Sequence, residues 1–146
     1  MQRFNNKRTK QEKQYDRAVE VINNLGGFCL QINAPIIKDK KQPADHLFHC
    51  NNKSIVFDCK ETKRKRFFFS YLKNKNNQIG GLSRALNNNY NYAGFVIRFT
   101  HIENLEFKDF FMPITQYLEL KKKGIKSVLP ADLIEFDIYK ILGIEL

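Results

Sequence analysis

Apolar and polar side chains alternate along the segment SIVFDCKETK, residues 54–63. A period of two predicts a β-strand, in which residues two positions apart point to the same face. Asp58 and Lys60 therefore share one face at the end of an otherwise apolar run. The segment DHLFHC, residues 45–50, is also strand-like, and the Asn51-Asn52 dipeptide after it tolerates positive φ. The pattern predicts a β-hairpin closed by a two-residue turn.

Helical spacing of apolar residues begins after a capping-box pattern at Thr9 and Glu12 and stops at Gly26-Gly27. We expect further helices over residues 77–88, 115–124 and 129–142, the last opened by Pro130, and further strands over residues 28–32, 94–100 and 107–114. Pro113 cannot donate to a strand ladder, so the last strand is expected at an edge. These elements predict one α/β domain over residues 1–146, with a mixed central β-sheet flanked by helices. We expect residues 1–8 to form a basic arm and residues 33–43 to form a loop.

The predicted hairpin register places three charged side chains close to one another. With Asn51-Asn52 as the turn, counting outward places Asp45 opposite Asp58, with Cβ atoms about 4.5–5.5 Å apart. Asp45, Asp58 and Lys60 would then share one patch. Two carboxylates this close repel unless a cation lies between them, and their hard oxygens suit Mg²⁺ or Mn²⁺. The alternative is a polar rim at the end of the sheet in which Lys60 forms a plain salt bridge.

A zinc site fits the pattern less well. The potential ligands are His46, His49, Cys50 and Cys59. The two histidines point to opposite faces of a strand, and the two cysteines lie at opposite ends of the hairpin, about 20 Å apart at ~3.3 Å per residue. Four ligands cannot converge there, so we interpret the histidines as ordinary strand residues.

The net charge of the chain indicates which class of molecule it binds. The formal net charge is +10 and the pI is near 9.6. A domain this basic attracts polyanions, above all nucleic acid. A membrane surface is the rival, but the basic residues do not form an amphipathic helix, and neither a membrane-spanning run nor a signal peptide is apparent. An odd number of cysteines, Cys29, Cys50 and Cys59, indicates free thiols in a reducing, cytoplasmic compartment.

The spacing of Pro43, Asp45, Asp58 and Lys60 resembles the motif of the PD-(D/E)xK nuclease superfamily. The wider segment IVFDCKETKRKRFFFSYLKNKNNQI, followed by GFVIRF, resembles the RecU-type Holliday junction resolvases of Gram-positive bacteria and their phages. The later FFMP and SVLPADLIE are similar to the tail of that family. The resemblance runs from residue 45 to the C-terminus and implies a restriction-endonuclease-like core.

The same resemblance implies roles for single residues. Asp45 and Asp58 would bind Mg²⁺, with Mn²⁺ as a substitute, Lys60 would be the catalytic lysine, and Gln78 would position water, metal or phosphate. The segment DRAVEVINNLGGF is similar to the first helix of archaeal junction resolvases, which places Asp16 at an acidic position of the site; Glu12 is the alternative. Asp58 replaces the usual glutamate of the family, and residues 33–42 stand in place of its long stalk.

The implied function is endonuclease cleavage of four-way DNA junctions by a homodimer that makes paired nicks. The expected DNA contacts are basic residues after the catalytic strand and in the arm: Lys63, Arg64, Lys65, Arg66, Lys73, Lys75, Arg3, Lys7 and Arg8. The aromatic row 67–71 is expected in the core or a dimer interface, unless one of its rings stacks on an unpaired base, and the row 107–111 is expected in the dimer interface. The alternatives are a nuclease acting on other DNA and a non-catalytic DNA-binding protein.

Overall fold

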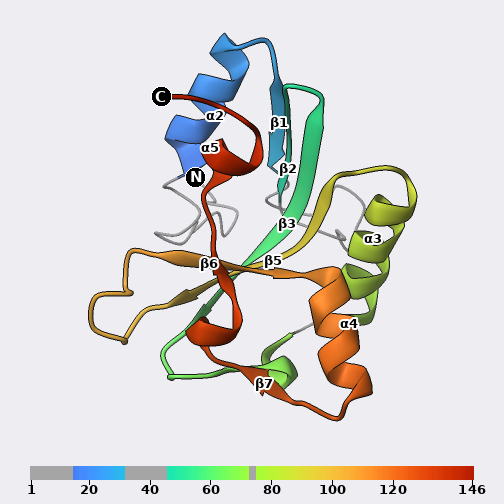
Figure 1. The fold of residues 1–146 in the computed structure, drawn as a ribbon, viewed down its shortest axis with the longest axis vertical. Coiled ribbons are helices and arrows are strands. Elements are labelled where there is room, and N and C mark those ends of the chain that lie inside the picture. Colours follow the sequence, from blue (N-terminus) through green and yellow to red (C-terminus); the bar gives the residue numbers. More distant parts are fainter. Residues whose placement is uncertain (1–14, 32–45, 73–74) are drawn as a thin grey trace, which may run out of the picture.

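A mixed β-sheet runs through the centre of the molecule (Figure 1). The computed structural model describes residues 15–31, 46–72 and 75–146. Within them the sheet has six strands in the order β1-β2-β3-β5-β6-β8. Their bounds are β1 Phe28–Gln31, β2 His46–Cys50, β3 Lys53–Thr62, β5 Tyr92–Phe99, β6 Asp109–Pro113 and β8 Ile134–Glu135. The β3–β5 pair is parallel and the other described pairs of this sheet are antiparallel, so the expected mixed α/β architecture is confirmed.

The β2–β3 hairpin has the predicted turn. Asn51 and Asn52 have φ values of 53° and 62°, the left-handed conformation that a type I′ turn requires at both central residues. Cys50 pairs with Lys53, and the described ladder continues to the pair His46–Phe57. The side chain of Asn51 also donates to the carbonyl of Leu142 at 3.1 Å, which ties the turn to the C-terminal segment.

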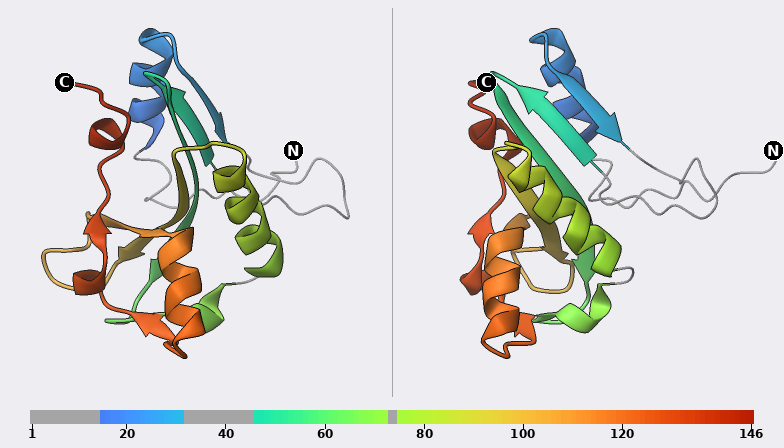
Figure 2. Two further views of the ribbon diagram at one scale, coloured as in Figure 1. Left: turned by 45° about the vertical axis from the view of Figure 1, so that its right-hand side comes forward. Right: turned by 90° about the vertical axis from the view of Figure 1, so that its right-hand side faces the viewer.

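Helices cover the two faces of the sheet. Their bounds are α2 Tyr15–Asn24, α3 Lys75–Asn87, α4 Ile114–Lys122 and α5 Ile138–Ile141. On one face α3 and α4 bury Leu82 and Tyr117 against Val56 and Phe95. On the other face α2 and α5 pack over Phe57 and its neighbours. Figure 2 shows α2 and α5 at one end of the molecule and α4 at the other.

A small second sheet lies beyond the end of β3. It pairs β4, Phe67–Phe68, with β7, Ser127–Val128, in antiparallel fashion. Two short 3₁₀ helices, η1 Phe69–Tyr71 and η2 Pro130–Asp132, follow these strands in the chain. The pairing joins segments about sixty residues apart.

Two predictions about the elements are wrong. Residues 129–142 do not form one helix: Pro130 opens η2, β8 follows, and α5 begins only at Ile138. The strand β6 is not at the edge, because Phe110 and Phe111 pair with β8. Pro113 lies beyond those pairs, where its missing N–H leaves the β6–β8 ladder intact.

Candidate active site

Asp58 and Lys60 project from the same face of β3, as the alternation predicts. Val56, two residues earlier, packs into the core under α3 and α4, so this is the face that those helices cover. The side chain of Asp58 is 1% exposed and that of Lys60 is 18% exposed, and Lys60 Nζ lies 2.7 Å from Asp58 Oδ2. A carboxylate is rarely buried to this extent unless a cation accompanies it.

The carboxylate of Asp58 is nevertheless incompletely satisfied. Both of its oxygens are buried and neither accepts a hydrogen bond from a described residue. The 2.7 Å approach of Lys60 is close enough for an ion pair, but its direction does not make a hydrogen bond. Buried carboxylate oxygens with open acceptor positions are suited to a metal ion.

Gln78 offers a third oxygen of the same kind. It lies in the first turn of α3, and α3 packs against β3 and β5. Its Oε1 atom is buried and accepts no hydrogen bond from the described residues. Asp58 and Lys60 thus lie on the face of the sheet that α3 covers, and Gln78 belongs to α3 itself. Two of the three carry unsatisfied buried oxygens, which are hard donors.

Of the other two predicted acidic residues, one is outside the described part of the chain and one lies on the opposite face of the sheet. Asp45 lies outside the described residues, one position before the first described pair, His46–Phe57. Asp16 is exposed in the first turn of α2, a helix that packs on the opposite face of the sheet. Within the described part of the chain, no group of three or more His, Cys, Asp or Glu side chains could hold a metal ion.

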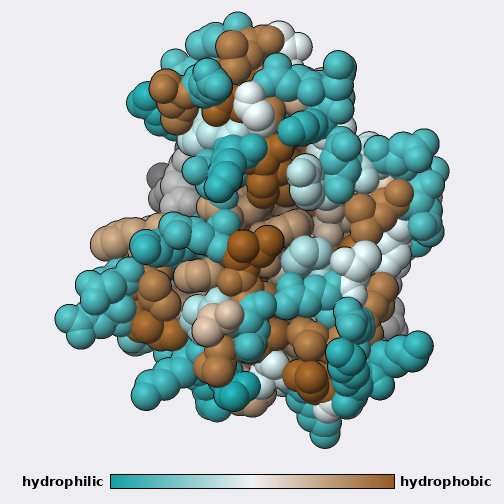
Figure 3. Space-filling model, viewed as in Figure 1, coloured by the Kyte–Doolittle hydropathy of each residue, from teal (hydrophilic) through white to brown (hydrophobic). Residues whose placement is uncertain are grey.

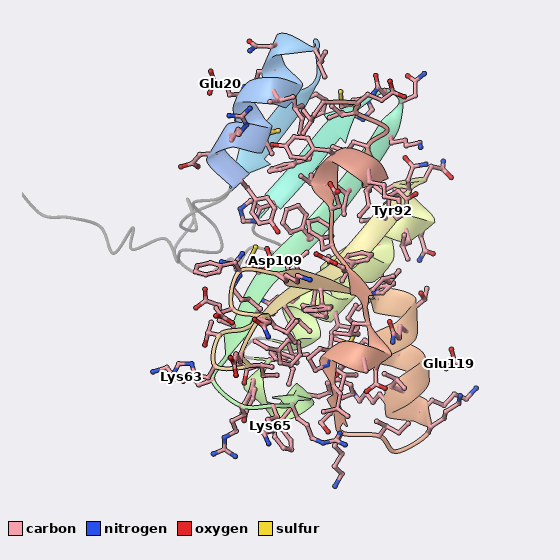
Figure 4. All side chains as sticks on the ribbon, turned by 60° about the vertical axis from the view of Figure 1, so that its left-hand side comes forward. Glu20, Lys63, Lys65, Tyr92, Asp109 and Glu119 are labelled. Carbon is pink, nitrogen blue, oxygen red and sulfur yellow. The ribbon has the colours of Figure 1, made fainter. Side chains whose placement is uncertain are left out.

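The predicted DNA contacts fall in different places. Residues Lys63–Arg66 are exposed in the connection from β3 to β4, and Figure 4 shows Lys63 and Lys65 pointing away from the body of the molecule. Arg66 Nη1 donates to Ser127 Oγ at 3.0 Å. The backbone of Lys75 begins α3. Arg3, Lys7, Arg8 and Lys73 lie outside the described residues.

A buried polar network occupies the α2 side of the sheet, and sequence reasoning missed it. Arg98 and Asp109 pair across β5 and β6, with Arg98 Nε donating to Asp109 Oδ1 at 2.9 Å. The hydroxyl of Tyr15 donates to Asp109 Oδ2 at 2.6 Å. Figure 4 places Asp109 within the body of the molecule. The pattern offered one weak signal: a charged residue inside each of two apolar strands.

The aromatic rows mainly build the core. Phe67, Phe69, Phe110 and Phe111 are 1–9% exposed, so the core interpretation holds for them and the interface interpretation does not. Phe107 is the exception, with 81% of its surface exposed. The side chains of Phe68 and Tyr71 are half-buried and meet edge to face with ring centroids 5.5 Å apart.

The three cysteines are free thiols, as predicted. Burial, followed by the charge of nearby Cys50, raises the pKa of Cys29 to about 12, which favours the unreactive thiol form. Cys59 Sγ lies 3.8 Å from His46 Nδ1 on the α2 side of the sheet. Among the described residues, no helix is long and apolar enough to cross a membrane.

Comparison with solved structures finds chains that are similar in fold. The chain is similar to the 1.6 Å structure of Hjc from Archaeoglobus fulgidus, a Holliday junction resolvase from an archaeal hyperthermophile. The TM-score is 0.44 and the identity is 12%, and the match covers 70% of this chain and 77% of that chain. No family model and no curated protein sequence matches the chain.

Proposed function

We propose that this protein is a metal-dependent endonuclease of restriction-endonuclease-like fold that resolves four-way DNA junctions. The observation that carries the proposal is the carboxylate of Asp58, which is buried, contacts Lys60 and has two oxygens that accept no hydrogen bond from a described residue. In a purely structural ion pair, hydrogen bonds would satisfy the remaining acceptor positions, because a buried carboxylate without them is costly. A bound divalent cation accounts for both the burial and the open positions.

The hairpin register supports Asp45 as the second ligand. The described pairs end at His46–Phe57, and one further step in the same register sets Asp45 opposite Asp58. Leu47 packs toward the same core as Val56, so the residue two positions before Leu47 is expected on the face of Asp58. Carboxylates from Asp45 and Asp58 with an amide oxygen from Gln78 form an all-oxygen set suited to Mg²⁺, with Mn²⁺ as a substitute.

We assign each of these side chains a separate role in phosphodiester cleavage. A divalent ion bound by these oxygens would supply Lewis-acid polarisation of the phosphate and an activated water. Asp58 fixes one side of that ligand set, and its burial holds the carboxylate in place. Lys60 is partly exposed beside it, where its ammonium can stabilise negative charge that develops on the phosphate. We assign Lys60 this electrostatic role, and Gln78 the positioning of water or phosphate.

Paired nicks require two such sites, which a homodimer would supply. A four-way junction has two-fold symmetry, and its separation into two duplexes needs cuts at matching points on opposed strands. Two copies related by a two-fold axis are the simplest arrangement that provides them. The net charge of +10 supports DNA as the substrate.

The decisive experiment is incubation of a labelled four-way junction with Mg²⁺ and mapping of the nicks on all four strands. We expect symmetric nicks on one opposed pair of strands, activity with Mn²⁺, and no cutting in a chelator. A linear duplex of the same sequence is the competitor. Equal cutting of the duplex would favour the general-nuclease alternative. Binding of the junction without any cutting in either metal would favour a non-catalytic DNA-binding protein.

A further inference from the structure

The structure joins two basic segments that lie far apart in the sequence. Strand β4 pairs with β7 through Phe67–Val128 and Phe68–Ser127, and Phe69 N donates to Lys126 O at 2.9 Å. The loop after β3 therefore lies beside the C-terminal end of α4 and the turn that follows it. The exposed basic side chains gathered at this end are Lys63, Arg64, Lys65, Arg66, Lys121, Lys122, Lys123 and Lys126.

Among the lysines of the second segment, Lys123 is the one that forms an ion pair with another described residue. Glu119 is the neighbouring acid on α4, and it pairs with Lys123 at 3.2 Å while both side chains remain mostly exposed. An exposed pair of this kind contributes little and is easily replaced by another partner. The lysines also interact favourably with the macrodipole of α4. That interaction requires only positive charge near the C-terminal end of the helix. Eight cationic side chains at one end of the molecule create a surface that strongly attracts anions.

A pocket of about 390 Å³ opens between residues 68–70, which follow the first basic segment, and residues 117–126, which include the second. Aromatic and aliphatic side chains from β4, η1, α4 and the following turn line it, together with two exposed lysines: Phe68, Phe69, Tyr117, Ile125, Lys121 and Lys126. In Figure 3, hydrophobic atoms bordered by hydrophilic ones lie between α4 and β7. The volume is within the usual range for small-molecule sites, and an apolar interior with a few cations is typical of them.

Neighbouring rings hold the walls of the pocket in place. The rings of Phe69 and Tyr117 meet at 4.9 Å and 67°, and both side chains are buried. Phe68 is held by Tyr71 at 5.5 Å and 70°. Burial also raises the pKa of Tyr117, which keeps that wall uncharged. A rigid aromatic wall loses little entropy when a planar ring packs against it.

We propose that this pocket receives one unpaired nucleotide of the DNA, with its base packed against the half-buried ring of Phe68 and its flanking phosphates on Lys121 and Lys126. This inference rests on the proposed function only in that the ligand is DNA. Bases of any sequence stack on aromatic side chains, and phosphates pair with lysine without reading sequence. A fully paired duplex offers no free base, so the pocket would favour DNA with unpaired or unstacked nucleotides, such as those at a junction crossover.

The test compares two labelled duplexes of the same sequence, one fully paired and one with a single unpaired nucleotide. Binding is measured by fluorescence anisotropy in a chelator, so that cleavage cannot contribute. We expect the wild type to prefer the bulged duplex by about fivefold or more, as stacking of one base provides. Ser70 is exposed and lines the pocket, so Ser70→Trp should fill it and abolish the preference while affinity for the paired duplex stays within about twofold.

A second variant keeps the test decisive if Ser70→Trp fails to fold. Ile125 is 40% exposed and lines the pocket, so Ile125→Glu places a negative charge there without removing core. It should also abolish the preference, because a carboxylate repels the nucleotide. The control is Asn23→Trp on the exposed side of α2, at the opposite end of the molecule, which should leave the preference intact (Figure 2).

The outcomes separate this proposal from the nuclease proposal. A wild type that binds both duplexes equally overturns the pocket proposal and leaves the nuclease intact. A preference that survives in folded Ser70→Trp and Ile125→Glu variants overturns it as well. A wild type that binds no DNA overturns both proposals. Loss of the preference in both variants but not in the control supports the pocket.

Discussion

Lys60 Nζ lies 2.7 Å from Asp58 Oδ2, yet the two side chains differ sharply in exposure, at 18% and 1%. The pair thus joins a fixed, buried negative charge to a positive charge that solvent can reach. Neither carboxylate oxygen accepts a hydrogen bond from a described residue. A buried charge that is only partly compensated lowers stability, and such arrangements are found at functional sites.

Replacement of Asp58 by asparagine should abolish cleavage and retain DNA binding, because the charge proposed to hold the metal is lost while the basic surface remains. Without metal, the variant should be at least as stable as the wild type, since an unsatisfied buried charge is removed. Mg²⁺ should raise the melting temperature of the wild type but not of Asp58→Asn. The control is Glu61→Gln at the exposed neighbouring site, which should keep the Mg²⁺ response. Normal turnover by Asp58→Asn would contradict the metal assignment.

Lys60→Ala tests a different role. We expect the cleavage rate to fall by about 10²–10³, the usual effect of removing a preorganised charge from a transition state. The Mg²⁺-induced rise in melting temperature should persist, because the ligand oxygens remain. Lys53→Ala, in the same strand and half-buried, is the matched control and should cleave normally. If Lys60→Ala cleaves at the normal rate, the lysine is a structural partner of Asp58 only.

The hairpin could be predicted because its signals are local. Alternation fixed the faces of β2 and β3, and the Asn51-Asn52 pair specified a turn in which both residues have positive φ. Those two facts set the register and the shared face of Asp58 and Lys60. The burial of Gln78 Oε1, which accepts no hydrogen bond from a described residue, depends on the packing of α3, and no local pattern contains that information.

The C-terminal segment shows why prediction failed elsewhere. The apolar residues of LPADLIEFDIYKIL fit a helical period about as well as an extended one. In the structure, Asp132 Oδ2 accepts from Leu129 N at 2.8 Å and closes the short η2 turn. Phe136 N then donates to Asp109 O at 2.7 Å, which draws the chain along β6. The pairing of β4 with β7 is equally non-local, so the lysines of residues 121–126 could not be placed beside residues 63–66.

Replacement of Lys63, Arg64, Lys65 and Arg66 by alanine should weaken binding to every DNA tested. Each lost phosphate contact should reduce the slope of log affinity against log salt by about 0.9 on B-form DNA. The measurement is a salt titration of affinity for a paired duplex in a chelator. Lys140→Ala, exposed on α5 at the opposite end of the molecule, should leave the slope unchanged. An unchanged slope in the fourfold variant would mean that the DNA path lies elsewhere.

Asp109→Ala should cost about 3–5 kcal/mol of unfolding free energy, because it leaves Arg98 as a buried charge without its carboxylate. Tyr15→Phe removes one hydrogen bond to the same carboxylate and should cost about 1–3 kcal/mol. Urea unfolding measures both values. The network lies on the face opposite Asp58, so the Mg²⁺ response of folded protein should persist in both variants. A loss of less than 1 kcal/mol in Asp109→Ala would show that water or another group replaces the carboxylate.

The oligomeric state is the last prediction, and the structure changes where the contact is expected. Four rings of the two aromatic rows are buried in the core, which leaves Phe107 at 81% exposure. Ile134 in the edge strand β8 is 66% exposed and pairs with Phe111, four residues after Phe107. Exposed apolar side chains at a sheet edge invite association with a second copy. We expect sedimentation to give twice the chain mass of 17.3 kDa at working concentration.

The variant Phe107→Asp/Ile134→Asp should sediment as a monomer and leave single, unpaired nicks in a four-way junction, because each chain then carries its metal site alone. Leu146→Asp is the control: this residue is 82% exposed at the C-terminus, so the variant should remain a dimer. A wild type that is monomeric and leaves unpaired nicks would overturn junction resolution and favour a general nuclease. A dimer that survives in the double variant would keep the paired-nick proposal but place the interface on another surface.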